Sequence, residues 1–306
     1  MTSFLTARPP RLRPQGVTGR HLRTPRGAGP RQGEGGLRRH GIYRRSDPDY
    51  PLVSVITVCF NAADTLAETI ASVRAQTYPN IEYIIVDGAS TDGTLAVIRR
   101  HQKNIDYYVS EPDDGLYDAM NRGLALAHGD YVMLLCADDH YHPKAIELLV
   151  RARAASGADV VGGMINFHRA DGSLMRPFGR LEFGPRSLVW MCMWLETLLI
   201  PTAVLDDLGA FDTRFHVAAD TDLGARLYAA GYSYYEVPIA VLAMRAGGAS
   251  GNHDVVTADH QRLVAERFPE VPAEWTRMVG DVTNFKKENY DAAVRACADR
   301  PAFVEA

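Results

Sequence analysis

The feature that most constrains the fold is a regular alternation of short apolar runs with longer segments of helical periodicity, beginning after Pro51. The first run, Leu52–Cys59, is apolar and β-branched, as expected of a strand covered on both faces. The segment after it carries Leu66, Ile70 and Val73 at the spacing of one helix face. Strands that alternate with helices form βαβ units. The sequence therefore predicts an α/β fold with a mixed, mostly parallel sheet flanked by helices.

The alternation continues along the next hundred or so residues. Further strands are predicted at 81–88, 105–110, 130–136 and 158–163, and further helices at 91–102, 115–129 and 143–157. In parallel sheets of this kind, ligands bind beyond the carboxyl ends of the strands. The first four strand ends are polar and three are acidic, reading CFNAAD, VDGASTDG, SEPDDG and CADDH. We therefore expect carboxylates from distant parts of the chain to meet at one edge of the sheet.

Charge is unevenly distributed along the chain. Residues 1–49 contain eleven Arg and three acidic residues, and the rest of the chain holds 22 basic against 34 acidic side chains. An acidic body argues against a nucleic-acid partner. It is compatible with a small phosphorylated ligand, because a bound cation can reverse the local field.

The first 49 residues are rich in Arg, Pro and Gly without an apolar period, so we expect a disordered basic arm. This arm has no apolar core of a secretory signal; it could rest on an anionic membrane, or it could be dispensable. Four scattered cysteines without a CxxC pair indicate a reduced, cytoplasmic protein, with peripheral contact at the inner membrane face as an open alternative. The apolar segment Leu188–Leu205 contains Glu196 and Pro201, so we interpret it as core and not as a membrane span.

The fourth predicted strand runs directly into two adjacent carboxylates, Asp138 and Asp139. Two like charges about 4 Å apart repel by about 4 kcal/mol at an effective dielectric constant of 20. A fold can keep such a pair if a cation lies between the carboxylates, and Mg²⁺ and Mn²⁺ prefer carboxylate and phosphate oxygens. Capping of the helix after Pro143 is the alternative role for this pair. The acidic ends of the other strands favour metal binding over helix capping as the role of Asp138 and Asp139.

Two long stretches resemble family 2 glycosyltransferases of the GT-A fold, which is Rossmann-like. They read VSVITVCFNAADTLAETIASVRAQTYPNIEYIIVDGASTDGT and SEPDDGLYDAMNRGLALAHGDYVMLLCADD. The resemblance covers about residues 52–250, and the order of the motifs is specific. The SEPDDGLYDAMNRG motif and the later GGAS look similar to bacterial exopolysaccharide and glycolipid enzymes of the colanic-acid type.

This resemblance implies an inverting, metal-dependent glycosyltransferase that moves a sugar from a nucleoside-diphosphate sugar to a lipid-linked or polysaccharide hydroxyl. The implied organisation is a basic arm at 1–49, a GT-A domain at 50–250 with a nucleotide-sugar half at about 50–140 and an acceptor half at about 141–250, and a helical extension at 251–306. Two alternatives stay open. One is a nucleotidyltransferase, although VCFNAADT lacks the Gly-rich, basic signature usual there; the other is a nucleotide-sugar-binding protein without transfer activity.

The same resemblance implies roles for individual residues. Asp139 would coordinate a divalent cation, Mn²⁺ or Mg²⁺, with the help of Asp138, and this cation would neutralise charge on the departing diphosphate. The residues implied in nucleotide-sugar binding are Phe60, Asn61, Asp87, Asp118, Asn121, Arg122 and Asp138. For Arg122, a place on a solvated helix face is an equal alternative.

The catalytic base is expected on Asp220, because AADTDL matches a family pattern of Ala-Asp-x-Asp-Leu. Inversion needs one carboxylate that takes the proton of the acceptor hydroxyl. A carboxylate near a helix N-terminus is favoured as the anion. Asp222, two residues on, is interpreted as a solvent-exposed neighbour, or as the base if Asp220 does not fill that role.

Two departures from the family pattern affect these expectations. The second strand ends in Asp87-Gly88 where many members have two aspartates, the second of which reads a uracil, so UDP, GDP and dTDP donors all stay open. Leu195-Glu196 stand where related enzymes often carry His-Gln, so the acceptor side or a metal contact could differ. Weaker candidates for metal contact are His140, His142 and His253.

Overall fold

A computed structural model describes residues 5–6, 29–169, 172–178, 183, 193–245 and 253–267. The predicted helical extension falls partly outside this range, because residues 268–306 are not among those described. No helix within the described segments is long and apolar enough to cross a membrane. The described part of the apolar segment singled out above, 193–205, forms three short elements instead of one helix.

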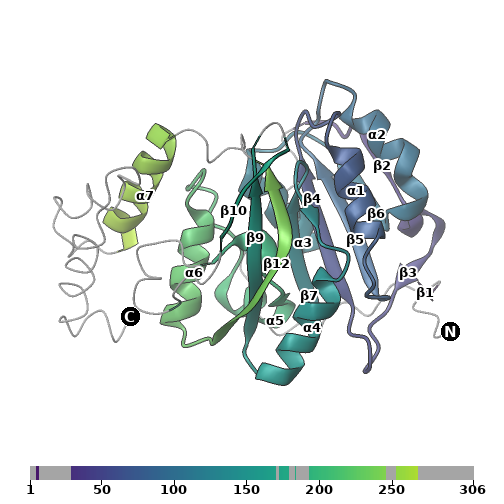
Figure 1. Ribbon diagram of the computed structural model, residues 1–306. Coiled ribbons are helices and arrows are strands. Elements are labelled where there is room, and N and C mark those ends of the chain that lie inside the picture. The colour runs from purple at the N-terminus through teal and green to yellow at the C-terminus, as the bar shows by residue number, and fades with distance from the viewer. Residues whose placement is uncertain are drawn as a thin grey trace, which may run out of the picture.

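The central sheet has six strands in the order β11-β7-β4-β5-β6-β2 (Figure 1). Its four inner strands run parallel: β7 (Tyr131–Cys136), β4 (Val53–Cys59), β5 (Ile81–Asp87) and β6 (Tyr107–Ser110). The two edge strands, β11 (Ile200–Pro201) and β2 (Gly33–Gly35), are antiparallel to their neighbours. The prediction of a mixed, mostly parallel sheet flanked by helices is therefore confirmed.

A second sheet of four strands extends the molecule, in the order β10-β9-β12-β8. Its members are β10 (Leu174–Phe178), β9 (Val160–His168), β12 (Tyr234–Arg245) and β8 (His140–Tyr141). The long pair β9 and β12 runs parallel, and β10 and β8 pair antiparallel to them. The two-residue strands β1 (Leu5–Thr6) and β3 (Tyr43–Arg44) also pair with each other.

Helices cover both faces of the central sheet. One face carries α1 (Leu66–Arg74), α2 (Thr94–His101) and α4 (Ala145–Ser156). The other carries α3 (Leu116–Leu126) and α5 (Thr202–Leu208), and α6 (Ala219–Ala229) and α7 (His253–Arg267) extend the same apolar core. Short 3₁₀ helices lie at η1 (Leu37–His40), η2 (Gln102–Asn104) and η4 (Leu195–Thr197).

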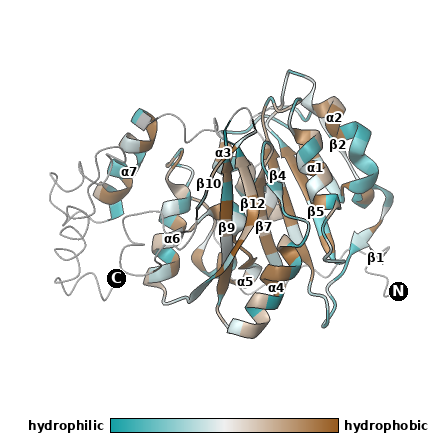
Figure 2. Cartoon of the chain, viewed as in Figure 1, coloured by the Kyte–Doolittle hydropathy of each residue, from teal (hydrophilic) through white to brown (hydrophobic). Residues whose placement is uncertain are grey.

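The core follows from the two-residue period of the strands. In β4, Val53 and Val55 pack with the helices of the first face, and Ile56 and Val58 pack with those of the second. Every residue of β4 is buried, which explains the continuous apolar run in its sequence. Figure 2 shows apolar residues along the central strands.

The expectation that all of residues 1–49 form a disordered arm is wrong for residues 29–49. Strand β2 pairs with the outer edge of β6, and η1 follows it directly. The buried Arg38 side chain of η1 forms an ion pair with the fully buried Glu82 of β5 and donates to the Leu126 carbonyl at 2.8 Å. Backbone pairing and this ion pair offset the entropy cost that argued for disorder.

Glu82 allows a test of this docking. Its carboxylate also accepts hydrogen bonds from the Ser54 hydroxyl at 2.6 Å and from the His128 backbone N–H at 2.8 Å. Burial alone would raise the pKa of Glu82, but the His128 imidazole, whose Nδ1 lies 3.2 Å from a carboxylate oxygen, and the Arg38 charge outweigh it and lower the pKa to about 2. Since the pKa is depressed by folding, the contribution to stability is complete above about pH 4.5 and is lost as the pH falls toward 2.

We expect Glu82→Gln to lower the free energy of unfolding at pH 7 by about 3 kcal/mol, because it leaves Arg38 buried without its counter-charge. Urea denaturation measures this, and the difference from wild type should shrink between pH 4.5 and pH 2. The matched control is Glu147→Gln, which breaks the surface pair with Arg151 and should change stability little. Equal losses of unfolding free energy in Glu82→Gln and Glu147→Gln would contradict the docking of η1 through Arg38 and Glu82.

Candidate active site

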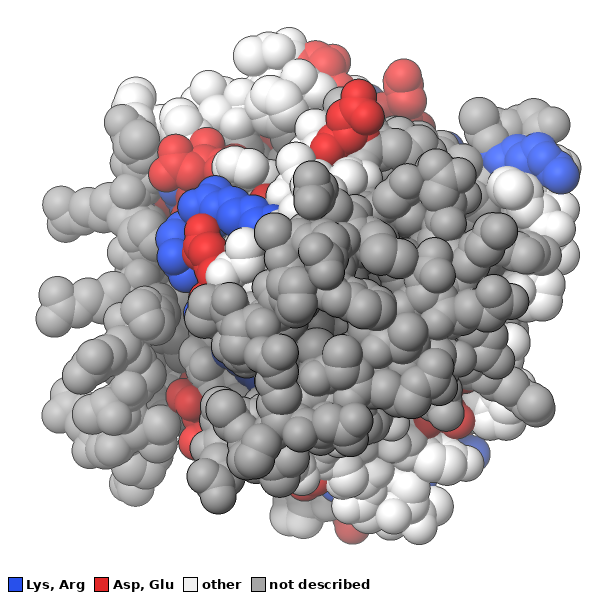
Figure 3. All heavy atoms as spheres, turned by 90° about the vertical axis from the view of Figure 1, so that its left-hand side faces the viewer, with Lys and Arg blue, Asp and Glu red and all other residues white. Residues whose placement is uncertain are grey.

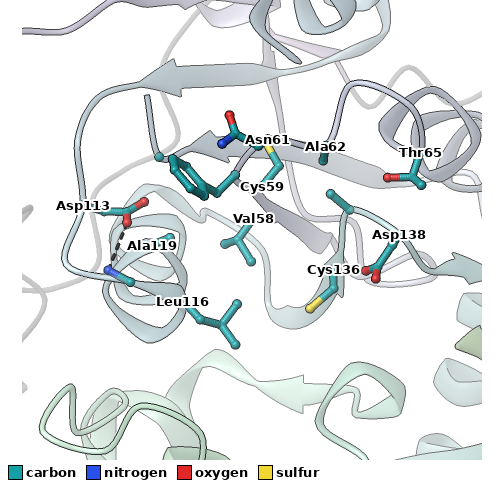
Figure 4. A pocket seen from close by; sticks show the side chains of 14 residues that line it. Val58, Cys59, Asn61, Ala62, Thr65, Asp113, Leu116, Ala119, Cys136 and Asp138 are labelled. Atoms are coloured by element: carbon teal, nitrogen blue, oxygen red, sulfur yellow. Dashed lines mark hydrogen bonds between the residues drawn. The ribbon is translucent and has the colours of Figure 1, made fainter. Parts of the chain in front are cut away.

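A cleft of about 740 Å³ lies at the carboxyl ends of the parallel strands (Figure 4). Its walls come from the ends of β4 and β7, from the loop after β5 and from the start of α3. The lining residues are Val58, Cys59, Phe60, Asn61, Ala62, Thr65, Gly88, Asp113, Gly115, Leu116, Ala119, Cys136, Ala137 and Asp138. Three predicted site residues, Phe60, Asn61 and Asp138, are therefore brought to one cavity.

The loop after β4 is fixed to the loop after β5 by hydrogen bonds. Asn61 adopts a left-handed backbone with φ of 51°, which asparagine tolerates better than most residues. Its backbone N–H donates to the Ser90 hydroxyl at 2.8 Å, and its side-chain oxygen accepts from the Thr91 N–H at 2.9 Å. This leaves the preceding Phe60 with a 66 % exposed side chain at the cleft, a position suited to stacking on a planar ligand.

Asp87 reaches the same edge but does not line the cleft, contrary to expectation. Its side chain is fully buried. One carboxylate oxygen accepts from the Ser110 hydroxyl at 2.6 Å, and the other accepts from the Ser90 hydroxyl. Asp87 therefore connects the ends of β5 and β6 to the loop that supports Asn61. Its role here is to hold the strand ends and that loop in place, behind the cleft wall.

Asp118, Asn121 and Arg122 also lie behind the cleft and are engaged with protein partners. Arg122 is 3 % exposed and pairs with Asp118 at 2.6 Å, one helical turn away. Asn121 donates to the Phe211 carbonyl and accepts from the Phe211 N–H, both at 2.9 Å. The three side chains hold α3 against neighbouring loops. This arrangement does not support the direct nucleotide contacts that the resemblance implies for them.

Asp113, which sequence reasoning did not single out, enters the cleft in their place. Its Oδ1 accepts from the Gly115 N–H at 3.0 Å (Figure 4). A Cβ atom built on Gly88 would lie 2.7 Å from Asp113 Oδ2. The carboxylate of Asp113 therefore fills the space next to the glycine that departs from the family pattern. Burial raises the pKa of this carboxyl.

A cluster of metal-ligating groups lies at the end of β7. Among the described residues, Cys136, Asp139 and Glu196 each offer one ligand atom, and these atoms all lie within 4.8 Å of one another. Asp138, the cleft-lining neighbour, is close enough to raise the pKa of both carboxyls. The Asp139 Oδ1 accepts the Arg245 N–H at 2.9 Å, which fixes this side chain to the end of β12.

The electrostatics of the cluster fit a cation. Burial and the neighbouring charges of Glu196 and Asp138 raise the pKa of Asp139 to about 8. Burial and the charges of Asp220 and Asp138 raise the pKa of Glu196 to about 7. Carboxylates that resist ionising together are stabilised by a divalent cation with a preference for oxygen, as Mg²⁺ and Mn²⁺ have. Burial also raises the pKa of the Cys136 thiol, so a neutral thiol stands beside these carboxylates.

Glu196 was noted in the sequence only as a departure from the family pattern, and the structure gives it a place in the cluster. His140 and His142 do not join this group of ligand atoms. His140 lies in β8, and the exposed His142 accepts the Lys144 N–H on its Nδ1 at 3.2 Å. His253 begins α7.

Asp220 lies in the first turn of α6, where the helix dipole favours a negative charge. Burial raises the pKa of its carboxyl, and the His260 charge and a Tyr117 hydrogen bond act in the opposite direction. Because its charge acts on Glu196, Asp220 lies near the metal-ligating cluster. Tyr117 directly follows the cleft residue Leu116, so α3 connects the cleft to Asp220. A raised pKa suits a group that must accept a proton.

Asp222 is fully buried, so its interpretation as a solvent-exposed neighbour is wrong. Its two carboxylate oxygens accept from Arg226 Nε at 2.9 Å and from Arg267 Nε at 2.7 Å. Residues two apart on a helix point in nearly opposite directions, so Asp222 faces away from Asp220. This carboxylate holds α6 to α7 and is unsuited to act as the base.

Comparison with known proteins supports the α/β architecture and adds an activity. A model of the family described as Glycosyl transferase family 2 matches residues 54–199. An uncharacterized glycosyltransferase of Mycobacterium tuberculosis is 35 % identical over 182 residues, which make up 56 % of this chain and 67 % of the relative.

Two solved structures share the fold. S. aureus TarS in complex with UDP-GlcNAc superposes with a TM-score of 0.57 at 15 % identity, covering 79 % of each chain. The mannosyltransferase PcManGT from Pyrobaculum calidifontis, in complex with GDP-Man and Mn²⁺, has a TM-score of 0.56 at 22 % identity. That match covers 83 % of this chain and 77 % of the other.

Proposed function

This chain belongs to glycosyl transferase family 2 and is a glycosyltransferase, and we propose that it transfers a sugar with inversion from a nucleoside-diphosphate sugar. The acceptor is a hydroxyl of a lipid-linked or glycan molecule. One observation carries the proposal: the cleft extends from the exposed ring of Phe60 to Cys136 and Asp138, which adjoin the carboxylates of Asp139 and Glu196, with Asp220 near that cluster. Action in the cytoplasm, with peripheral contact at the inner membrane face, stays a prediction from the sequence.

The cation would be held by Asp139 and Glu196, with Asp138 on the cleft side. A divalent ion there supplies charge neutralisation for the diphosphate leaving group. With the cation bound, Asp139 and Glu196 would hold the diphosphate of the donor in the region that adjoins Asp220. This division of roles explains why the end of β7 brings together carboxylates that would repel each other without a ligand.

The chemical step uses the base at the start of α6. Asp220 takes the proton of the acceptor hydroxyl, whose oxygen forms a bond to the anomeric carbon of the sugar. The bond from that carbon to the diphosphate oxygen breaks, and the nucleoside diphosphate leaves with the electron pair. Attack from the side opposite the leaving group inverts the configuration at this carbon.

The nucleobase is selected near the end of β5. Asp113 offers a carboxylate acceptor next to Gly88, where it can receive hydrogen bonds from a base or from ribose hydroxyls. TarS and PcManGT were solved with a uridine and a guanosine nucleotide sugar, respectively. UDP, GDP and dTDP donors all stay candidates for this chain.

Phe60 provides a test of the donor pocket. We expect Phe60→Ala to raise the KM for the donor by about 10-fold through loss of base stacking, with kcat changed by less than about 2-fold. Initial rates over a range of donor concentrations measure both constants. Tyr235→Ala, which removes an exposed ring from β12, is the control and should leave KM unchanged. A wild-type KM for Phe60→Ala would remove the stacking role.

The function itself is tested with a panel of nucleotide sugars and Mn²⁺, followed by mass spectrometry of the products. Release of the sugar or its transfer to an acceptor, together with a nucleoside diphosphate, is the expected result. Formation of a nucleoside triphosphate and a sugar 1-phosphate when pyrophosphate is also supplied would instead indicate nucleotidyl transfer. Donor binding without any product across the panel, acceptors included, would point to a binding protein.

A further inference from the structure

Helix α7, like α6, lies outside residues 54–199, which match the family model, and it packs against α6, the helix that carries Asp220. Its Leu263 and Val264 are fully buried in the core that includes Leu223 and Leu227 of α6. On the side of the molecule where α7 lies, basic and acidic side chains adjoin at the surface (Figure 3). These observations make α7 part of the folded domain.

The contacts of α7 concentrate on the start of α6. Its Asp259 accepts the N–H groups of Val217 at 2.7 Å and of Ala218 at 3.0 Å, directly before the helix begins. The N-terminal N–H groups of a helix have no partner inside the helix, so a carboxylate here orders the entry to α6. The next residue of α7, His260, approaches the base itself.

A chain of polar contacts connects His260 to Asp220. Thr221 Oγ1 lies 3.5 Å from Asp220 Oδ1 and 3.2 Å from His260 Nε2. On the other side of the ring, His260 Nδ1 lies 2.9 Å from the Val256 carbonyl oxygen. A carbonyl oxygen only accepts, so Nδ1 carries the proton and the ring orientation is fixed. Both His260 and Thr221 are buried, at 8 % and 2 % exposure.

The groups that face Asp220 come from three other elements: Tyr117 of α3, Glu196 of η4 and His260 of α7. Of these three, His260 alone can carry a positive charge. A positive charge on its imidazole lowers the pKa of the Asp220 carboxyl and so favours the carboxylate. The hydroxyl of Thr221 stands between ring and carboxylate. It can donate its one proton to Asp220 while accepting from Nε2 if that nitrogen carries a proton, and it donates to Nε2 otherwise.

We propose that His260, acting through Thr221, is a positioning residue that holds the Asp220 carboxylate in the orientation needed to accept the proton of the acceptor hydroxyl. Helix α7 is then part of the catalytic arrangement. This inference rests on the assignment of Asp220 as the base. The transferred proton goes to Asp220, and His260 does not take it.

Paired substitutions test the proposal. Thr221→Val keeps the shape but removes the hydroxyl, and His260→Phe keeps a ring but removes both nitrogens. We expect each to lower kcat by about 10- to 100-fold while the KM for the donor and the thermal unfolding temperature stay near wild type. Thr221→Ser restores the hydroxyl and should keep most of the wild-type kcat. Arg262→Gln, on the exposed side of α7, is the control.

The outcomes separate this inference from the assignment of the base. Wild-type kcat in Thr221→Val overturns the positioning role, and so does an equal loss in Thr221→Ser and Thr221→Val. If Asp220→Asn is inactive while both test variants are fully active, the base stands and the positioning role falls. If Asp220→Asn is fully active, Asp220 is not the base, and the proposal that depends on it falls as well. In an Asp220→Asn background, Thr221→Val should cause no further loss, because the group it orients is gone.

Discussion

Asp139→Asn is expected to lower kcat by about 1,000-fold and to leave the protein at least as stable as wild type without metal. The asparagine amide keeps an oxygen that can accept the Arg245 N–H. It removes one negative charge from a cluster whose members raise each other's pKa, so repulsion with Glu196 and Asp138 is relieved. Catalysis is lost because the cation that neutralises the diphosphate is no longer held.

Two measurements check this expectation. Initial rates with saturating donor and Mn²⁺ give the change in kcat. Thermal unfolding with and without Mn²⁺ should show a metal-dependent rise in Tm for wild type and none for the variant, since a ligand stabilises only the state that binds it. Asp64→Asn, which changes an exposed carboxylate outside the cluster, should behave as wild type. Glu196→Gln should behave as Asp139→Asn, and a fully active Glu196→Gln variant would exclude Glu196 from the site.

Asp220→Asn is expected to lower kcat by about 100- to 10,000-fold with little change in the KM for the donor. The amide fills the same space but cannot take a proton from the acceptor. Donor and metal are held by other residues, so their binding should persist. Calorimetric titration of donor with Mn²⁺ and single-turnover transfer rates measure the two effects separately.

Asp222→Asn is the matched control, because it changes the same residue type two positions along the same helix. It removes a charge that two arginines share, Arg226 and Arg267, so it should lower the free energy of unfolding by about 3 kcal/mol. The folded fraction should keep most of its kcat. Near wild-type transfer by Asp220→Asn, with loss of transfer by Asp222→Asn, would reverse the assignment of the base.

The fold could be predicted from sequence because the residues of its core recur at the spacing of strands and helices within short segments. The buried run of β4 and the helix face of Leu66, Ile70 and Val73 require no knowledge of distant partners. The convergence of strand ends follows from parallel topology, and Phe60, Asn61 and Asp138, which the family resemblance singled out, lie at one cleft. Residues 29–49 were misjudged because their order depends on an edge strand and on Glu82, both far along the chain.

The site was predicted less completely, because a motif gives the neighbourhood of a residue but not the direction of its side chain. Asp118 and Arg122 lie four apart on α3 and satisfy each other, which turns both away from the cleft. Glu196 enters the cluster from η4, whose position depends on packing against β7 and β9 and not on any local pattern. Burial of Asp87 depends likewise on serines from two separate segments.

The central claim is that carboxylates from separate segments hold one divalent cation at the end of β7. Anomalous X-ray diffraction from crystals grown with Mn²⁺ and a nucleoside diphosphate tests it most directly, because the signal locates manganese independently of the protein coordinates. We predict one strong peak in contact with Asp139 and Glu196 and with the diphosphate oxygens. A nucleotide bound in the cleft with no manganese peak there, or a peak away from both carboxylates, would contradict the account.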